Sequence, residues 1–344
     1  MRAANRGTLS QLPGRFAVSH SESDSPPVSR PTRYHREKAS SIIMTNRSPD
    51  LPFEQSINPY RGCEPGCLSS YARPNHASVD LSPGQDFESE IFCKDNAAEV
   101  LRDSLRKPSY RCRPIVLGTV TDPYQPIERE RRITRELLQV LVDCQHPFSL
   151  ITKSTLVLRD LDRMAPMAAE GRASVAVSVT TLDNRLKNQL EPRASGGRER
   201  LKTVRELARA GVPVTVLVAP LIPFINDHEL EDIVEQVAAA GARSAGYVAL
   251  RLPHEVGPLW EEWLQRHYPE RADRVMSALK EMHGGASYDS RWHHRQRGQG
   301  PMAELLARRF QVACRRHGLA PRESFTLDSS AFRPPGLAGQ MHLW

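Results

Sequence analysis

The sequence predicts an α/β fold built on a parallel sheet, and two observations support this prediction. Short apolar or β-branched runs alternate with segments of helical spacing about six times between residues 56 and 250. No sequence repeat accompanies this alternation. The chain has 344 residues, of which 39% are hydrophobic and 25% charged, as expected of one large globular domain with tails. Parallel strands need right-handed helical crossovers, so six such units indicate a doubly wound sheet or a partial barrel.

Each predicted strand is a short apolar or β-branched run, which is typical of strands buried on both faces. The strands are expected at residues 56–60, 114–120, 148–152, 174–179, 212–219 and 244–250. The spacing of apolar residues predicts helices at 97–106, 130–144, 156–169, 199–210 and 229–240. Beyond residue 250 the pattern predicts helices without strands, at 256–268, 270–282 and 302–317, and we expect these to cap one end of the sheet.

The two ends of the chain differ from its centre in composition and charge. Four segments are expected: a disordered basic segment at 1–50, the α/β unit at 51–255, a helical extension at 256–318 and a disordered tail at 319–344. The net charge of +7 comes from these ends, because residues 1–47 carry 8 Lys and Arg against 3 Asp and Glu, and residues 286–344 carry 9 against 4. Basic ends could contact nucleic acid, although solvated tails are the more common explanation.

Several classes of protein are excluded by the composition. No run of about 18 apolar residues is present to cross a bilayer, so no membrane partner is expected. The first thirty residues lack the apolar core of a secretory signal, and a cytoplasmic location is expected. Six cysteines are too few for a disulfide scaffold, and in a reducing compartment paired cysteines more often bind metal or do chemistry.

The residues that follow the predicted strands are candidate site residues, because parallel α/β folds bind ligands at the carboxyl ends of their strands. After the first strand, Cys63 and Cys67 lie on a loop with Gly and Pro and can direct two thiolates at one centre. A loop that holds a four-iron cluster with one open iron needs the spacing C-x3-C-x2-C, and here the third position is Ser70. A hydroxyl is a hard oxygen donor and a poor substitute for thiolate on iron–sulfur.

Several short motifs taken together are specific. They are SINPYRGC at 56–63, YARP at 71–74, LSPG at 81–84, DFE at 86–88, TDPYQPIE at 121–128, TKS at 152–154, LEPR at 190–193 and NDHE at 226–229. By these motifs residues 50–318 resemble the radical S-adenosylmethionine (radical SAM) enzymes, within them a group related to spore photoproduct lyase. The resemblance implies a TIM-like partial (β/α)6 barrel over 51–255, a 4Fe-4S cluster and S-adenosylmethionine, which is cleaved reductively to a 5′-deoxyadenosyl radical.

The resemblance also implies roles for particular residues. The metal ligands would be Cys63 and Cys67, with Ser70 in the third place. The residues expected to bind S-adenosylmethionine are Tyr71, Thr121, Asp122, Lys153, Ser178, Glu191 and Arg193. Ordinary structural roles compete with several of these, because Asp122 could be a turn residue, and Glu191 and Arg193 could form a surface salt bridge.

Three hypotheses on function stay open. The first is a radical SAM enzyme that needs an electron donor and acts on an unknown substrate, with nucleic acid as one candidate. Its cluster would use Ser70, or another thiol such as Cys93, as the third ligand. The second is a non-catalytic relative that keeps the barrel and the affinity for S-adenosylmethionine. The third is a nucleic-acid-binding module that uses the basic ends. His293 and His294 are interpreted as part of a surface loop.

Overall fold

The computed structural model describes residues 6–8, 10–16, 30–321 and 326–336. Its main sheet has eight strands in the order β11-β10-β9-β8-β7-β6-β3-β2. The strands are β2 (Met44–Thr45), β3 (Gln55–Ile57), β6 (Ile115–Leu117), β7 (Phe148–Thr152), β8 (Ala173–Ser178), β9 (Val214–Leu221), β10 (Ser244–Ala249) and β11 (Ala320–Pro321). The strands β3 and β6 to β10 correspond to the six predicted ones, and neighbours among them pair in parallel. Within the described residues β3 does not pair with β10, so the fold is an open, partial barrel, as predicted.

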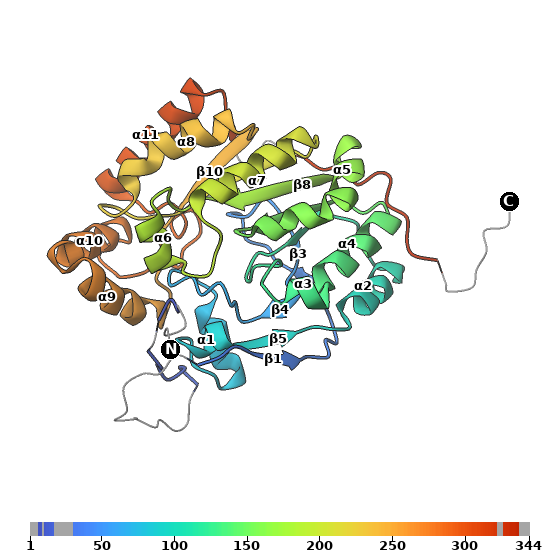
Figure 1. The fold of residues 1–344 in the computed structure, drawn as a ribbon, viewed down its shortest axis with the longest axis horizontal. Coiled ribbons are helices and arrows are strands. Elements are labelled where there is room, and N and C mark those ends of the chain that lie inside the picture. Colours follow the sequence, from blue (N-terminus) through green and yellow to red (C-terminus); the bar gives the residue numbers. More distant parts are fainter. Residues whose placement is uncertain (1–5, 9, 17–29, 322–325, 337–344) are drawn as a thin grey trace.

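Helices cover the outer side of this sheet and one of its ends (Figure 1). The crossover helices are α2 (Ala97–Arg106), α4 (Ile133–Asp143), α5 (Leu161–Ala169), α7 (Gly197–Arg209) and α8 (Leu230–Ala239), and shorter ones are α1 (Asp86–Ser89), α3 (Glu128–Arg131) and α6 (Asn184–Leu190). The predicted carboxyl-terminal helices are α9 (Val256–His267), α10 (Pro269–Met282) and α11 (Gly300–Arg316). Helix α11 packs against α8 and so extends the outer layer, while α9 and α10 pack together beside it.

The main hydrophobic core lies between the sheet and the outer helices. Helix α4 presents Leu137, Leu138 and Leu141 to it, and all three are fully buried. Every residue of β8 is buried, because helices cover one face of this central strand and the barrel interior lies on the other. This explains why the strands appear in the sequence as continuous apolar runs. No helix of the described part is long and apolar enough to cross a membrane.

A second, three-stranded sheet shows that the prediction of disorder at residues 1–50 is wrong for the described part of that segment. Its order is β1-β5-β4, with β1 (Arg33–Arg36) parallel to β5 (Glu90–Cys93) and β4 (Tyr60–Arg61) antiparallel to it. Strand β1 is polar and mostly exposed, so it carries no apolar signal. Contacts with distant residues hold it in place, among them a hydrogen bond between His35 and Glu90 at 2.6 Å and an ion pair between Arg36 and Asp95 at 2.7 Å.

The carboxyl-terminal end is also ordered in part, contrary to the prediction of a disordered tail at 319–344. Strand β11 pairs in parallel with β10. Further along, Thr326 and Leu327 line a cavity of about 720 Å³ on the inner face of the sheet. Phe332 then packs against the rings of Tyr110 and His146. These contacts join segments far apart in the chain, which is why local composition did not reveal them.

Candidate functional site

The cysteine loop begins directly after β4 and is shaped by two glycines. Gly62 and Gly66 have φ angles of 77° and 67°, in the left-handed region that favours glycine. A Cβ atom on Gly62 would lie 2.7 Å from the carbonyl oxygen of Glu90, so a side chain does not fit there. The Gly66 amide donates to the carbonyl of Cys63 at 3.0 Å. The backbone therefore turns tightly between Cys63 and Cys67.

A buried arginine forms hydrogen bonds with the backbone of this loop. Arg73 is fully buried, and its Nε donates to the carbonyl oxygens of Cys67 and Leu68, both at 3.1 Å. Its guanidinium also pairs with the fully buried carboxylate of Glu88 at 2.5 Å. Since both charges are removed from water, each depends on the other and on the surrounding hydrogen bonds. The ion pair therefore fixes the carbonyl groups of the loop in one arrangement.

The amino-terminal segment closes over the same loop. The amides of Gly7 and Thr8 donate to the two carboxylate oxygens of Glu88 at 2.8 and 3.1 Å. A Cβ atom on Gly7 would lie only 2.0 Å from the carbonyl oxygen of Gly66, so the two backbones are in close contact. The composition of residues 1–50 gave no sign of this contact. We refer to residues 6–8 and 10–16 as the amino-terminal strap.

The two thiols of the loop are buried and close to each other. Burial, and then the neighbouring Cys67, raise the pKa of Cys63 well above its usual value. Burial and the carboxylate of Glu191 raise the pKa of Cys67 to about 11, and the positive charge of Lys153 opposes this rise. Both groups are therefore thiols at neutral pH unless a positive ion stabilises the thiolate form.

The donor set at this loop does not fit a three-thiolate cluster. Ser70 supplies a hydroxyl at the third position, and its Oγ accepts the amide hydrogen of Ala72 at 3.4 Å. Cys93 lies in the main hydrophobic core, whereas Cys63 packs in a separate small cluster with Ala72 and Phe87. The described residues contain no group of three His, Cys, Asp or Glu side chains that could hold a metal ion. The structure therefore gives no support to Cys93 as the third ligand.

Asp122 ties the end of β6 to the end of β7. Its carboxylate accepts hydrogen bonds from the Thr152 hydroxyl at 2.7 Å, from the Lys153 amide at 2.8 Å and from the Tyr124 amide at 2.9 Å. The hydroxyl of Thr121 donates to the carbonyl of Tyr60 at 2.8 Å. Asp122 is therefore more than a turn residue, because it positions the backbone around Lys153, whereas Thr121 connects this loop to β4.

Lys153 lies next to a buried ion pair. Its Nζ is 3.6 Å from Oε1 of Glu191, whose Oε2 pairs with Arg200 at 2.5 Å. The hydroxyl of Thr180 donates to the same carboxylate at 2.7 Å. Burial raises the pKa of Glu191, but Arg200 and Lys153 outweigh it, so that the net shift is downward. Glu191 is thus a buried anion that keeps Lys153 charged, and it does not pair with Arg193, contrary to one expectation. Sequence reasoning missed Arg200, which looks like an ordinary helix residue.

The other predicted site residues have definite partners. Arg193 pairs with Glu64 of the cysteine loop at 2.9 Å. The carbonyl of the buried Ser178 accepts a hydrogen bond from Arg200 at 3.0 Å.

The hydroxyl of Tyr71 donates to the carbonyl of Thr119, while the guanidinium of Arg251 lies over the Tyr71 ring at 4.7 Å from the centroid. Tyr71 as a whole residue is 43% exposed.

A small cavity of about 120 Å³ opens where the cysteine loop meets the ends of β6 and β7. Pro65, Asp122, Lys153 and Arg193 line it, together with Arg129 and Ser195. Three of these side chains are cationic, and the carboxylate of Asp122 is already occupied by hydrogen bonds. The cationic lining suits an anionic group of a ligand, such as a carboxylate.

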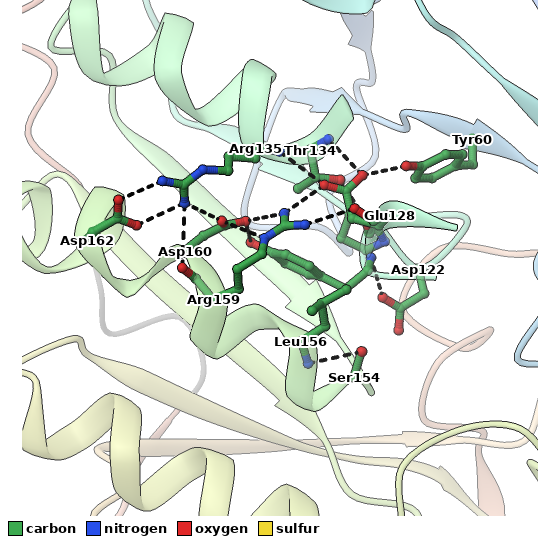
Figure 2. Close-up of polar contacts among 12 residues, drawn as sticks. Tyr60, Asp122, Glu128, Thr134, Arg135, Ser154, Leu156, Arg159, Asp160 and Asp162 are labelled. Atoms are coloured by element: carbon green, nitrogen blue, oxygen red, sulfur yellow. Dashed lines mark hydrogen bonds and ion pairs between the residues drawn. The ribbon is translucent and has the colours of Figure 1, made fainter. Parts of the chain in front are cut away.

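A network of ion pairs lies behind this cavity (Figure 2). Arg159, in the 3-10 helix η2 (Thr155–Asp160), pairs with Glu128 and Asp160, both at 2.7 Å. Arg135 of α4 pairs with Asp160 at 2.7 Å, and the hydroxyl of Tyr124 donates to Asp160 at 3.0 Å. Both carboxylates are fully buried. The network joins residues 121–128 to the segment after Lys153, and its members Arg135 and Asp160 carry no motif that would have revealed them.

The fold and the motifs together define a radical SAM protein. The model of the Radical SAM superfamily matches residues 57–237, and the chain belongs to this superfamily. Among solved structures, spore photoproduct lyase superimposes with a TM-score of 0.58 at 16% identity, covering 85% of this chain and 82% of the other, and one such structure contains a dinucleoside spore photoproduct. At this identity the likeness shows the fold alone.

Sequence relatives add little about function. A Mycobacterium tuberculosis protein described only as uncharacterised is 37% identical over 226 residues, 65% of this chain and 66% of its own length. The sporulation killing factor maturation protein SkfB of Bacillus subtilis is 40% identical over 72 residues, 21% of this chain and 17% of its own. Superfamily membership implies a 4Fe-4S cluster and S-adenosylmethionine. The cysteine loop, however, lacks the third thiol that such a cluster needs.

Proposed function

We propose that this chain binds S-adenosylmethionine at the carboxyl edge of its sheet, and that its two-thiol loop does not by itself complete the cluster that would cleave this cofactor. The observation that carries the proposal is the contrast within one site. The cavity around Lys153 already has the cationic lining that a carboxylate needs. The neighbouring loop has the thiols of Cys63 and Cys67 but no third thiol.

The binding half of the proposal rests on the charge and position of Lys153. Its side chain is 23% exposed and borders the cavity, while Glu191 and Arg200 behind it are buried. The amino-acid end of S-adenosylmethionine presents a carboxylate, which pairs favourably with a partly desolvated ammonium group. Arg193, held by Glu64, places a second cation on the same cavity. We expect the aromatic ring of Tyr71 to contact the adenine.

A second candidate is full radical chemistry, in which the bound cofactor is cleaved reductively and the radical acts on an unknown substrate. The observation in its favour is the rigid loop, because the ion pair of Arg73 and Glu88 preserves its course beside Lys153. This candidate needs a third ligand from Ser70 or from another molecule, and it needs an electron donor.

One experiment separates the two candidates. Protein purified without oxygen is assayed for iron and sulfide, and the affinity for S-adenosylmethionine is measured by calorimetry. We expect saturable binding, with far fewer than the four irons of a complete cluster in each chain. Lys153→Met should weaken binding about tenfold or more, because a hydrogen bond to a charged group is worth about 1.5–3 kcal/mol. Lys202→Met changes an exposed lysine of α7 and serves as the control.

Two results would decide between these candidates. Failure of the wild-type chain to bind S-adenosylmethionine would end the proposal. A brown protein with a full complement of iron that cleaves the cofactor would establish the second candidate instead.

We also propose nucleic acid as a partner. A structure of spore photoproduct lyase contains a dinucleoside spore photoproduct, and the ends of this chain are basic. Phosphate contacts predict that affinity for an oligonucleotide falls steeply as salt rises from about 50 to 200 mM. A filter-binding titration at several salt concentrations tests this, and no binding at low salt would remove nucleic acid from consideration.

A further inference from the structure

Residues 46–54 join β2 to β3 and form a hairpin loop at one edge of the main sheet. The amide of Asn46 donates to the carbonyl of Glu54 at 2.8 Å, which closes the base of this hairpin loop. The side-chain amide of Asn46 donates to the carbonyl of Phe53 at 2.7 Å. Since the hairpin loop directly precedes β3, it lies at the amino ends of the parallel strands, whereas the cysteine loop lies at their carboxyl ends.

The tip of the hairpin loop is fixed by Asp50, whose contacts we call the latch. The carboxylate of Asp50 accepts the amide hydrogen of His293 at 2.6 Å and pairs with Nε of Arg295 at 2.6 Å. The guanidinium of Arg295 also donates to the hydroxyl of Ser48. The side chains of Asp50 and Arg295 are 4% and 19% exposed. Because both charges are largely removed from water, each depends on the other.

The segment that receives the hairpin loop belongs to the opposite side of the sheet. The amide of Ala249, the last residue of β10, donates to the carbonyl of Gln296 at 2.8 Å. Strands β3 and β10 are the first and last of the six parallel strands. The latch therefore spans the open side of the partial barrel.

The latch also holds one residue in a strained backbone conformation. His293 has a φ angle of 67°, in the left-handed region, which is unfavourable for a residue with a side chain. The hydrogen bond from the His293 amide to Asp50 keeps the residue in this conformation. Release of the latch would relax the strain, so the strain favours an open arrangement while the side-chain contacts favour the closed one.

The hairpin loop forms one wall of the cavity of about 720 Å³ on the inner face of the sheet. Seven of its nine residues line this cavity, Leu51 and Phe53 among them. The opposite wall is the sheet itself, with Ser149 of β7, Ser174 of β8 and Thr215 of β9. The volume lies within the usual range for sites that bind small organic molecules, about 300–1,000 Å³. Movement of the hairpin loop would expose this wall of the sheet.

We propose that the hairpin loop is a gate at the amino end of the partial barrel. The latch between Asp50 and residues 293–295 keeps the gate closed, and its release admits a small molecule to the inner cavity. The chain thereby has an entrance opposite to the cysteine loop. The proposal does not depend on binding of S-adenosylmethionine, because the gate and the cavity around Lys153 share no residue.

The test measures access to the wall that faces the hairpin loop. Ser174→Cys places a thiol on this wall, and all further variants are made in this background. The tryptic peptide of residues 173–185 then contains this cysteine and no other. Its rate of alkylation by iodoacetamide, followed by mass spectrometry, reports access to the cavity. Amide hydrogen exchange of residues 46–54 reports release of the hairpin loop in the same protein.

Variants of the latch should raise both rates. Arg295→Gln should raise them at least tenfold, the usual effect of losing a charged hydrogen bond. Asp50→Asn keeps an acceptor for the His293 amide, so a smaller rise is expected. The double variant should be no faster than Arg295→Gln alone, because the two residues act through one another. Arg291→Gln changes a nearby arginine that pairs with Asp289, and should stay within about twofold of the background.

Four results would overturn the proposal. The first is alkylation of Ser174→Cys in the background protein as fast as that of free cysteine, since the gate would then not be closed. The second is an alkylation rate that Arg295→Gln leaves unchanged, or raises while the amides of the hairpin loop stay protected. The third is an equal effect of Arg291→Gln and Arg295→Gln, and the fourth is multiplication of the single effects in the double variant. Circular dichroism and urea denaturation of each variant establish that the overall fold is kept.

Discussion

Arg73 and Glu88 form a fully buried ion pair directly beneath the cysteine loop, at 2.5 Å. Arg73 donates hydrogen bonds to the carbonyls of Cys67 and Leu68 in the loop. Glu88 accepts hydrogen bonds from the amides of Gly7 and Thr8 in the amino-terminal strap. The pair thus connects three segments that are distant in sequence. The arrangement of these segments therefore depends on two charged side chains, each of which would be unfavourable to bury without the other.

Breaking this pair should destabilise the protein strongly. We expect Arg73→Met to lower the free energy of unfolding by about 3–5 kcal/mol, because Glu88 is left as an uncompensated buried charge. Urea denaturation measures this value. The control is Arg209→Gln, which removes an exposed pair with Glu206 and should change stability by less than about 1 kcal/mol. If the two substitutions lower the free energy of unfolding equally, burial of the Arg73 pair does not make it more important for stability than an exposed pair.

Ser70→Cys should increase the iron content of protein reconstituted without oxygen. The new thiol completes a three-thiolate set with Cys63 and Cys67, and thiolate is the donor that iron–sulfur clusters prefer. Iron and sulfide analysis and the brown absorbance are the measurements. Ser69→Cys adds the same thiol one position earlier and should have little effect. Cys93→Ala should leave the iron content unchanged, and a loss of iron in this variant would restore Cys93 as a ligand.

The strap should protect Cys67 from alkylation. A side chain at position 7 would collide with the carbonyl of Gly66, so Gly7→Val should displace the strap and lower stability by about 1–3 kcal/mol. Alkylation of Cys67 by iodoacetamide, followed by mass spectrometry, should then be faster. Gly336→Val is the matched control, because a Cβ atom there meets nothing within 4 Å. Unchanged alkylation in Gly7→Val would mean that the strap does not shield the loop.

Stability should fall as the pH drops from about 6.5 to 4. Burial lowers the pKa of His146 from 6.5 to about 4. In this interval the unfolded chain binds a proton that the folded chain does not, so acidification favours unfolding by roughly 3 kcal/mol at most. His146→Gln should flatten this part of the profile of unfolding free energy against pH. His228→Gln, at an exposed position, should not. Identical profiles for the His146 variant and wild type would contradict the prediction.

Much of the architecture could be read from local pattern. The six parallel strands and the crossover helices follow from runs and spacings of apolar residues, because burial against a sheet imposes these patterns on the chain itself. The positions of Cys63 and Lys153 near one edge follow from the same reasoning, since parallel strands end on one side. Glu191 is expected at the site only from the family resemblance. The small sheet and the ordered part of residues 1–50 were missed because β1 is polar and exposed.

The sequence by itself determined the fold class, the superfamily and the absence of a third cysteine at position 70, since all three depend on residue identities at fixed spacing. Only the tertiary structure decided which charges meet. Glu191 pairs with Arg200 and Lys153, and not with the nearby Arg193. Spacing along the chain cannot reveal such partners, because a buried charge is stabilised by whatever opposite charge the packing brings within a few ångströms, however distant that residue is in sequence.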